Sequence, residues 1–123
     1  MPFESAELLK KGQPVDGVSV DDVRSVLHAM TENVLLEIQK TFDFFKATAS
    51  SDRIDRIVLS GGASRVDGFA QALEERFGAP VETFDPFRRI GFEPSRLGIT
   101  DPDSVVTTAA VAVGLALRRA GDR

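Results

Sequence analysis

The chain contains no cysteine and a single histidine, His28, among its 123 residues. Without cysteine it can form no disulfide, no thiolate zinc site and no cysteine nucleophile, and one histidine is too few for a histidine-based metal cluster. We therefore expect no metal site and no cysteine nucleophile in this chain. Its length allows one hydrophobic core, so we expect a single domain over residues 1–123.

Long apolar runs and a surplus of positive charge are also lacking. No run approaches the roughly 20 apolar residues of a membrane-spanning helix, and the first residues, MPFESAELLKK, lack the basic, apolar and small-residue order of a signal peptide. We expect a cytoplasmic protein that does not insert into the membrane. The 15 Lys and Arg residues are outnumbered by 19 Asp and Glu, and this net charge of −4 argues against nucleic-acid binding.

Apolar periodicity predicts an α/β fold that contains one long helix. A short helix is expected over residues 4–11, before Gly12 and Pro14. Apolar residues then recur at steps of three and four, which predicts a helix from Val20 to Thr48 with Ser19 as its N-cap. The predicted apolar stripe consists of Val20, Val23, Leu27, Met30, Val34, Ile38, Phe42 and Phe45.

The second half of the chain predicts a strand, a helix and a second strand. A β-branched run over residues 54–60 ends at Gly61 and is typical of a buried parallel strand. A helix with an apolar face ending at Gly78 should follow, and residues 81–84 should form the second strand of a short parallel sheet. The face of this helix consists of Val66, Phe69, Ala70, Leu73 and Phe77.

Residues 85–100 carry glycine and proline at short intervals and should form an irregular loop. A last helix is expected after it, with Asp101 as N-cap and Pro102 in the first position. The face that this helix should bury consists of Val105, Ala109, Ala112, Val113, Ala116 and Leu117.

The segment SGGASRVDG, residues 60–68, is the strongest candidate for a binding site because it joins a strand to a helix. Amides at the start of a helix point outward, Gly61 and Gly62 permit close approach, and Arg65 could stack on a flat ring. The spacing is neither GxGxxG nor that of a P-loop. On spacing alone, a purely structural glycine turn explains the segment equally well.

The span IVLSGGASRVDGFAQALEERFG resembles the adenosine motif of the actin, Hsp70 and sugar kinase superfamily. More closely, the chain from about Glu4 to Arg119 resembles the carboxy-terminal part of the PilM family, the actin-like ATPases of the type IV pilus inner-membrane platform. The segments AELLKKG, QKTFDFFKA and PVETFDPFRRIGF carry this resemblance, together with the helix TTAAVAVGLALRR. It implies a partial actin-like, ribonuclease H-like subdomain that binds nucleotide.

The resemblance also implies which residues contact ATP. Those beside the adenine would be Gly61, Gly62, Ala63 and Arg65, and those at the ribose would be Glu7, Lys10 and Lys11. Glu7 and Lys10 lie three residues apart, so a solvated surface ion pair is the alternative explanation for them. Only the adenosine side of the ATP site is expected in this chain.

Catalysis in the superfamily uses two acidic hairpins that hold magnesium and the phosphates, and the resemblance implies that both precede residue 1. No D-x-G-x-x-[ST] hairpin occurs in the sequence, so we expect no ATP hydrolysis by this chain alone. The intact parent would be a magnesium-dependent ATPase, cytoplasmic and peripheral to the bacterial inner membrane, that contacts pilus platform proteins.

The resemblance further implies that the strand at residues 54–60 has one unpaired edge. We expect self-association, a swapped segment or a rearrangement of the long helix to cover it. Two other functions stay open. One is a freestanding α/β interaction module whose glycine turn is purely structural, and the other is a small nucleotide-binding protein of another α/β class.

Overall fold

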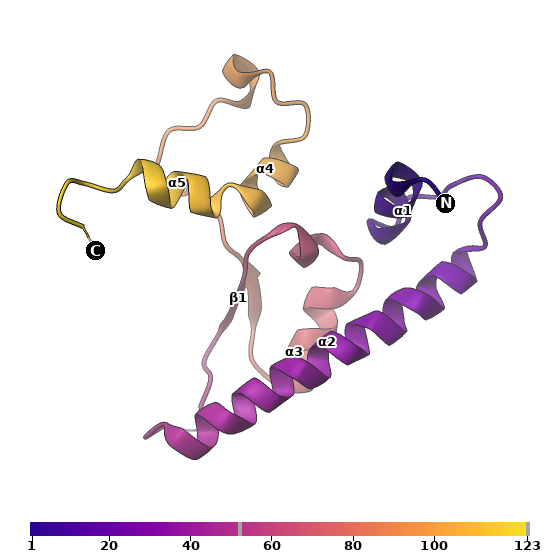
Figure 1. Cartoon of the computed structure of the whole chain (residues 1–123), viewed down its shortest axis with the longest axis horizontal. Helices are drawn as coiled ribbons and strands as arrows, with labels where there is room; N and C mark the ends of the chain where they lie inside the picture. The colour runs from indigo at the N-terminus through magenta and orange to yellow at the C-terminus, as the bar shows by residue number, and fades with distance from the viewer. Residues whose placement is uncertain (52, 123) are drawn as a thin grey trace. The chain divides into compact units, whose positions relative to one another are not determined.

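The structure, a computed structural model, describes residues 1–51 and 53–122. Its contacts group into two compact units, which are described separately: unit 1 is residues 1–57 and 66–81, and unit 2 is residues 58–65 and 82–123. The described elements, in chain order, are α1 (Phe3–Lys10), α2 (Val20–Thr48), β1 (Ile57–Leu59), the 3₁₀ helix η1 (Gly62–Arg65), α3 (Phe69–Phe77), β2 (Val81–Thr83), the 3₁₀ helix η2 (Pro94–Leu97), α4 (Pro102–Thr108) and α5 (Ala110–Ala116) (Figure 1). The predicted α/β fold is confirmed, while the single domain stays a prediction.

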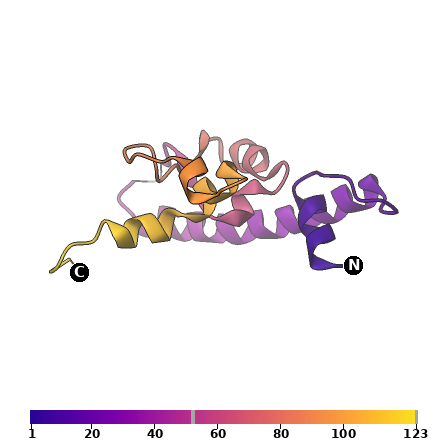
Figure 2. The same ribbon diagram turned by 90° about the horizontal axis from the view of Figure 1, so that it is seen from above.

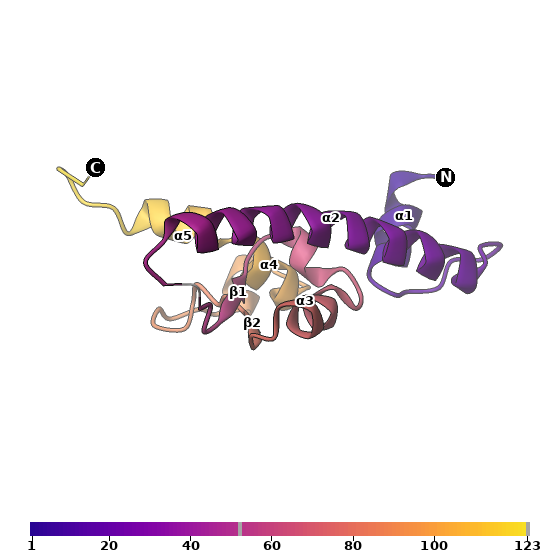
Figure 3. The ribbon, with the colours of Figure 1, turned by 90° about the horizontal axis from the view of Figure 1, so that it is seen from below.

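The long helix α2 begins and ends where the sequence predicts. The Ser19 hydroxyl accepts a hydrogen bond from the Asp22 backbone N–H at 3.4 Å, which caps the amino end. Acidic side chains occupy its first turn and Lys46 its last, as the helix dipole favours. In unit 1, α1 packs beside the amino-terminal part of α2 and α3 packs against α2 further along (Figures 2 and 3).

The buried face of α2 coincides with the predicted stripe only in part, since Val23, Leu27, Ile38 and Phe42 are half-buried. Leu35, which the prediction omitted, is 1% exposed, and α2 packs on α3, where Leu73 is equally buried. Phe42 contacts Phe77 of α3 with ring centroids 4.6 Å apart. Four members of the predicted stripe are instead 41–55% exposed: Val20, Met30, Val34 and Phe45. The helix is apolar around more of its circumference than α1 and α3 cover, so periodicity alone did not identify the contact face.

The sheet is parallel, as predicted, but its first strand is shorter. The Ile57 N–H donates to the Pro80 carbonyl at 2.9 Å, and the Phe84 N–H donates to the Leu59 carbonyl at 2.7 Å. This offset is the parallel pattern, with the two strands side by side in Figure 3. Residues 54–56 and Ser60 lie outside β1, because the three residues of β2 pair with only three residues of β1.

The helix after the glycine turn starts later than its apolar pattern indicated. Val66 lies in a turn between η1 and α3 and not on the helix, because Gly68 takes a positive φ of 76° and α3 begins only at Phe69. The end is as predicted: Gly78 has φ 64° and its N–H donates to the Glu74 carbonyl at 2.9 Å.

The last helix is divided into α4 and α5 at Ala109. Its start is as predicted, since the Asp101 carboxylate accepts from the Ser104 N–H at 3.2 Å and Pro102 occupies the first turn. Helical hydrogen bonds of 2.9 Å continue into and out of Ala109, so the division is a small local distortion. The predicted burial of the second half was wrong. Ala112, Ala116 and Leu117 are exposed, since the main contact of α5 is with α4, its neighbour along the chain.

Candidate functional site

The glycine turn in unit 2 is fixed by backbone hydrogen bonds to α4. The Gly61 N–H donates to the Thr107 carbonyl at 2.7 Å, and the Ser64 hydroxyl donates to the Gly61 carbonyl at 2.6 Å. Gly61 has φ 95°, a conformation that side-chain-bearing residues rarely adopt. The turn therefore requires glycine at position 61 for its own geometry, whatever binds there.

The next two residues leave the backbone of the turn open. Gly62 and Ala63 are exposed, and a Cβ placed on Gly61 would meet nothing within 4 Å. A Cβ on Gly62 would lie 3.9 Å from the Thr108 Cγ2, an ordinary van der Waals contact. Neither glycine is closely covered by other residues on the side to which a Cβ would point.

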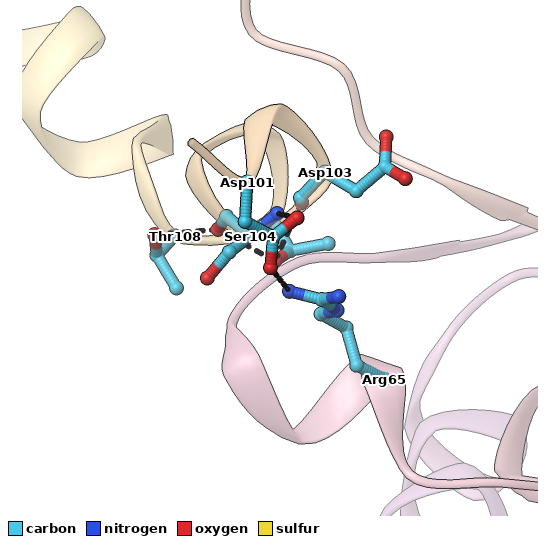
Figure 4. A network of polar contacts seen from close by, with 6 residues as sticks. Arg65, Asp101, Asp103, Ser104 and Thr108 are labelled. Carbon is cyan, nitrogen blue, oxygen red and sulfur yellow. Dashed lines mark hydrogen bonds and ion pairs between the residues drawn. The ribbon is translucent and has the colours of Figure 1, made fainter. Parts of the chain in front are cut away.

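Arg65 is held at the start of α4. One of its guanidinium nitrogens lies 3.1 Å from the Asp101 Oδ2, while the Oδ1 of the same carboxylate caps the helix through Ser104 (Figure 4). The Arg65 side chain is 24% exposed, so part of it remains accessible. The sequence predicted Asp101 as a cap but not as the partner of Arg65, because nothing local links residues 36 positions apart. The stacking role of Arg65 stays a prediction.

The residues predicted at the ribose lie on α1 and at its C-cap in unit 1, with Glu7 and Lys10 on the helix and Lys11 directly after it. The Lys10 ammonium donates a hydrogen bond to the Glu7 Oε1. This bond, and then the positive charges of Lys10 and Lys11, lower the pKa of the Glu7 carboxyl, although partial burial opposes them. Lys11 is exposed at the carboxyl end of α1, where its backbone N–H bonds the last turn. The surface ion pair is thus present, and ribose contact stays a prediction.

The sequence that forms these elements matches a known protein family over almost its whole length. The family model described as type IV pilus assembly protein PilM matches residues 1–120. The chain belongs to this PilM family. The match confirms the predicted resemblance. It gives the chain a role in type IV pilus assembly, which implies interaction with the pilus machinery.

The PilM-family chain also has a cavity of about 340 Å³ within unit 1, which sequence reasoning did not anticipate. It lies among the end of α1, the segment after it, the amino-terminal half of α2 and the turn before α3. The Asp67 N–H donates to the Lys10 carbonyl at 3.3 Å and holds two of these segments together. Its polar lining includes Arg24, His28 and Glu32. No local signal could have identified the cavity, because its residues come from four separate segments.

Two further findings concern the described part of this PilM-family chain. Within residues 1–51 and 53–122, no three His, Cys, Asp or Glu side chains gather as a metal ion would require. Among the helices of the same residues, none has both the length and the apolar character needed to cross a bilayer.

Proposed function

We propose that this PilM-family chain supplies the adenosine side of an ATP site in a type IV pilus assembly protein. The observation that carries the proposal is the open glycine turn of unit 2, which is braced on α4 and has Arg65 beside it. A preformed site of this kind binds its ligand without first ordering the chain, so little of the binding free energy is spent on ordering.

Each group of the site has a chemical task in this proposal. The adenine would lie along the Gly62 and Ala63 backbone, with the Arg65 guanidinium near its face, where a cation is attracted to the π-system. The Glu7 carboxylate, which Lys10 keeps ionised, would accept hydrogen bonds from the ribose hydroxyls. ATP supplies phosphates that need metal and amide partners, which the parent's acidic hairpins would provide. This chain alone would therefore bind nucleotide weakly and not hydrolyse it.

The parent protein would be an actin-like ATPase at the cytoplasmic side of the inner membrane, in contact with other platform proteins. Nucleotide binding to the parent would then influence those contacts. The family membership supports the pilus role, and the nucleotide role rests on the site.

A nuclear magnetic resonance titration of the chain tests this proposal. We expect adenosine and ATP to shift the amides of residues 61–65 with similar, weak affinities, with or without magnesium. Arg65→Ala should remove the shifts. Arg96→Ala is the matched control, because Arg96 is an exposed arginine of the same unit that is ion-paired to Glu93 at 3.5 Å.

The Gly62→Ala variant tests the proposed adenine position without disturbing the fold. Because the added methyl would only contact Thr108 at an ordinary distance, the variant should keep its stability. It should bind adenosine at least about tenfold more weakly, since the methyl occupies space that the base would use, a loss of about 1.4 kcal/mol. Equal binding by Gly62→Ala and the unmodified chain would contradict the adenine position.

The alternative function is a freestanding interaction module with a structural glycine turn. One observation favours it: the Arg65 guanidinium already has a protein partner in Asp101. Under this alternative no nucleotide shifts residues 61–65 at any concentration. Tight, magnesium-dependent binding would instead indicate a small nucleotide-binding protein of another α/β class and would overturn the proposal.

The proposal includes self-association through the outer edge of β1. In the described residues β1 pairs with β2 along one edge, and in a parallel ladder the Val58 N–H and carbonyl point to the other. Val58→Pro removes a donor from that outer edge without removing the bonds of Ile57 or Leu59. It should lower self-association in sedimentation experiments, and an unchanged sedimentation profile would contradict this part of the proposal.

A further inference from the structure

Helix α2 carries a line of exposed apolar side chains beside the face that packs on α1 and α3. The line consists of Val26, Met30 and Val34, which are 60%, 54% and 47% exposed. Residues four apart lie on one side of a helix, so these three side chains are contiguous. A shallow groove continues along the same side and includes Val34, Ile38 and Thr41. Contiguous exposed apolar surface of this kind marks an interaction site.

Opposite charges lie beyond the two ends of this line. Asp22 precedes it and Lys40 follows it, 18 residues later. At 3.6 residues per turn, 18 residues make five full turns, so both side chains lie along the same flank of α2. Lys40 is 71% exposed and its only short contact among those described is with Glu37 of its own helix, at 2.6 Å. The midpoint of the apolar line is position 30 and that of the charged pair is position 31, one residue or about 1.5 Å further along the helix.

We propose that this surface pairs with the same surface of a second copy of the chain, with the two α2 helices antiparallel and a two-fold axis near Met30. Reversal of the helix places Val26 against the partner's Val34 and Asp22 beside the partner's Lys40, and the symmetry repeats both contacts. The self-complementary pattern is what identifies a second copy as the occupant. A parallel pair would place like charges together, whereas antiparallel helices also align opposite ends of their dipoles.

Three apolar side chains and one charged pair from each copy form a small interface. Interfaces of this size are typical of weak or transient association. A covalent trap is therefore the suitable assay, and the chain allows one because it has no cysteine of its own. In each trap two thiols form one disulfide and give two electrons and two protons to an added oxidant, diamide.

Met30→Cys is the first trap, and Ala29→Cys is its matched control. Both positions are exposed and adjacent along the helix, but Ala29 is rotated by about 100° around it relative to Met30. We expect Met30→Cys to form disulfide dimers at least about tenfold faster than Ala29→Cys, because only its sulfur atoms can meet with disulfide geometry. Equal rates for the two variants would overturn the proposal.

Mixed traps determine the direction of the helices. Val26→Cys mixed with Val34→Cys should give the heterodimer, whereas each variant alone should cross-link slowly. In the antiparallel pair, position 26 and the partner's position 26 are separated by about 12 Å along the axis, beyond the reach of a disulfide. Faster cross-linking of Val26→Cys with itself than with Val34→Cys would indicate parallel helices and refute the proposal.

Charge exchange tests the reciprocal pairs. In the Met30→Cys background, Asp22→Lys alone should slow cross-linking several-fold, and adding Lys40→Asp should restore the rate. Failure of the double exchange to restore it would contradict the Asp22 and Lys40 contacts. All these traps measure disulfide formation between α2 helices. Their outcome is therefore independent of nucleotide binding at residues 61–65. It is also independent of pairing at the outer edge of β1, which Val58→Pro tests separately.

Discussion

Replacing Leu35 by alanine should destabilise unit 1 by about 3 kcal/mol. The Leu35 side chain is 1% exposed, and it lies seven residues, or about two helical turns, before Phe42, which contacts Phe77 of α3. Removing it loses about 1.5–3 kcal/mol of transfer free energy, and the cavity left behind adds to the cost. With a urea m-value of about 1.5 kcal/mol/M for a chain of this size, the unfolding midpoint should fall by about 2 M.

Leu36→Ala is the control for this prediction, because Leu36 is the next residue, has the same side chain and is 48% exposed. Its loss removes about half of the transfer term and leaves no cavity, so the cost should be near 1 kcal/mol. Urea unfolding followed by far-ultraviolet circular dichroism measures both variants. Equal midpoints for the two would refute the reasoning, since α2 would then not bury the face that contains Leu35.

Three further predictions concern other contacts. A double-mutant cycle with Phe42→Leu and Phe77→Leu should give a coupling free energy of about 1 kcal/mol, because the two rings are in direct contact. Gly61→Ala should cost about 1–2 kcal/mol of stability in urea unfolding, because alanine is strained at a φ of 95°. The pKa of the Glu7 carboxyl is lowered in the folded chain. Ionised Glu7 should therefore stabilise the fold at pH values above the ordinary pKa of a glutamate, and this stabilisation should be lost as the pH falls through the lowered pKa. Glu7→Gln should remove this part of the acid dependence of stability.

Each of these predictions has an outcome that contradicts it. Additive effects of the two phenylalanine variants would show that the rings do not interact. Gly62→Ala is the control for Gly61→Ala, and equal losses would mean that the positive φ is not the cause. For Glu7, an acid-unfolding curve that Glu7→Gln leaves unchanged would show that Lys10 does not stabilise the carboxylate.

The sequence predicted best the features that local chemistry determines. Ser19 and Asp101 mark helix starts because their side chains bond amides of the first turn, and Gly78 marks a helix end because it takes a left-handed conformation. These signals need only neighbours along the chain. For the same reason the glycine turn at the end of β1 was predictable as a candidate site.

Features that depend on distant neighbours were predicted less well. Periodicity showed that α2 is apolar but could not separate the line containing Met30 from the face containing Leu35, because burial depends on where α3 packs. Leu117 is exposed because, among the described contacts, α5 packs mainly against α4, its neighbour along the chain. At the candidate site, the pairing of Arg65 with Asp101 joins positions that no local pattern connects.

The two adjacent glycines of the turn have different reasons to be glycine, and sequence variation among family members should separate them. Position 61 is constrained by its own backbone angle, so it should remain glycine in every member that keeps this turn. Position 62 has an ordinary angle and room for a methyl group, so its own backbone does not require glycine, and under the proposed nucleotide site the incoming base would restrict it. If the proposed adenine position is correct, members that do not bind nucleotide should carry larger residues at position 62 while keeping glycine at position 61.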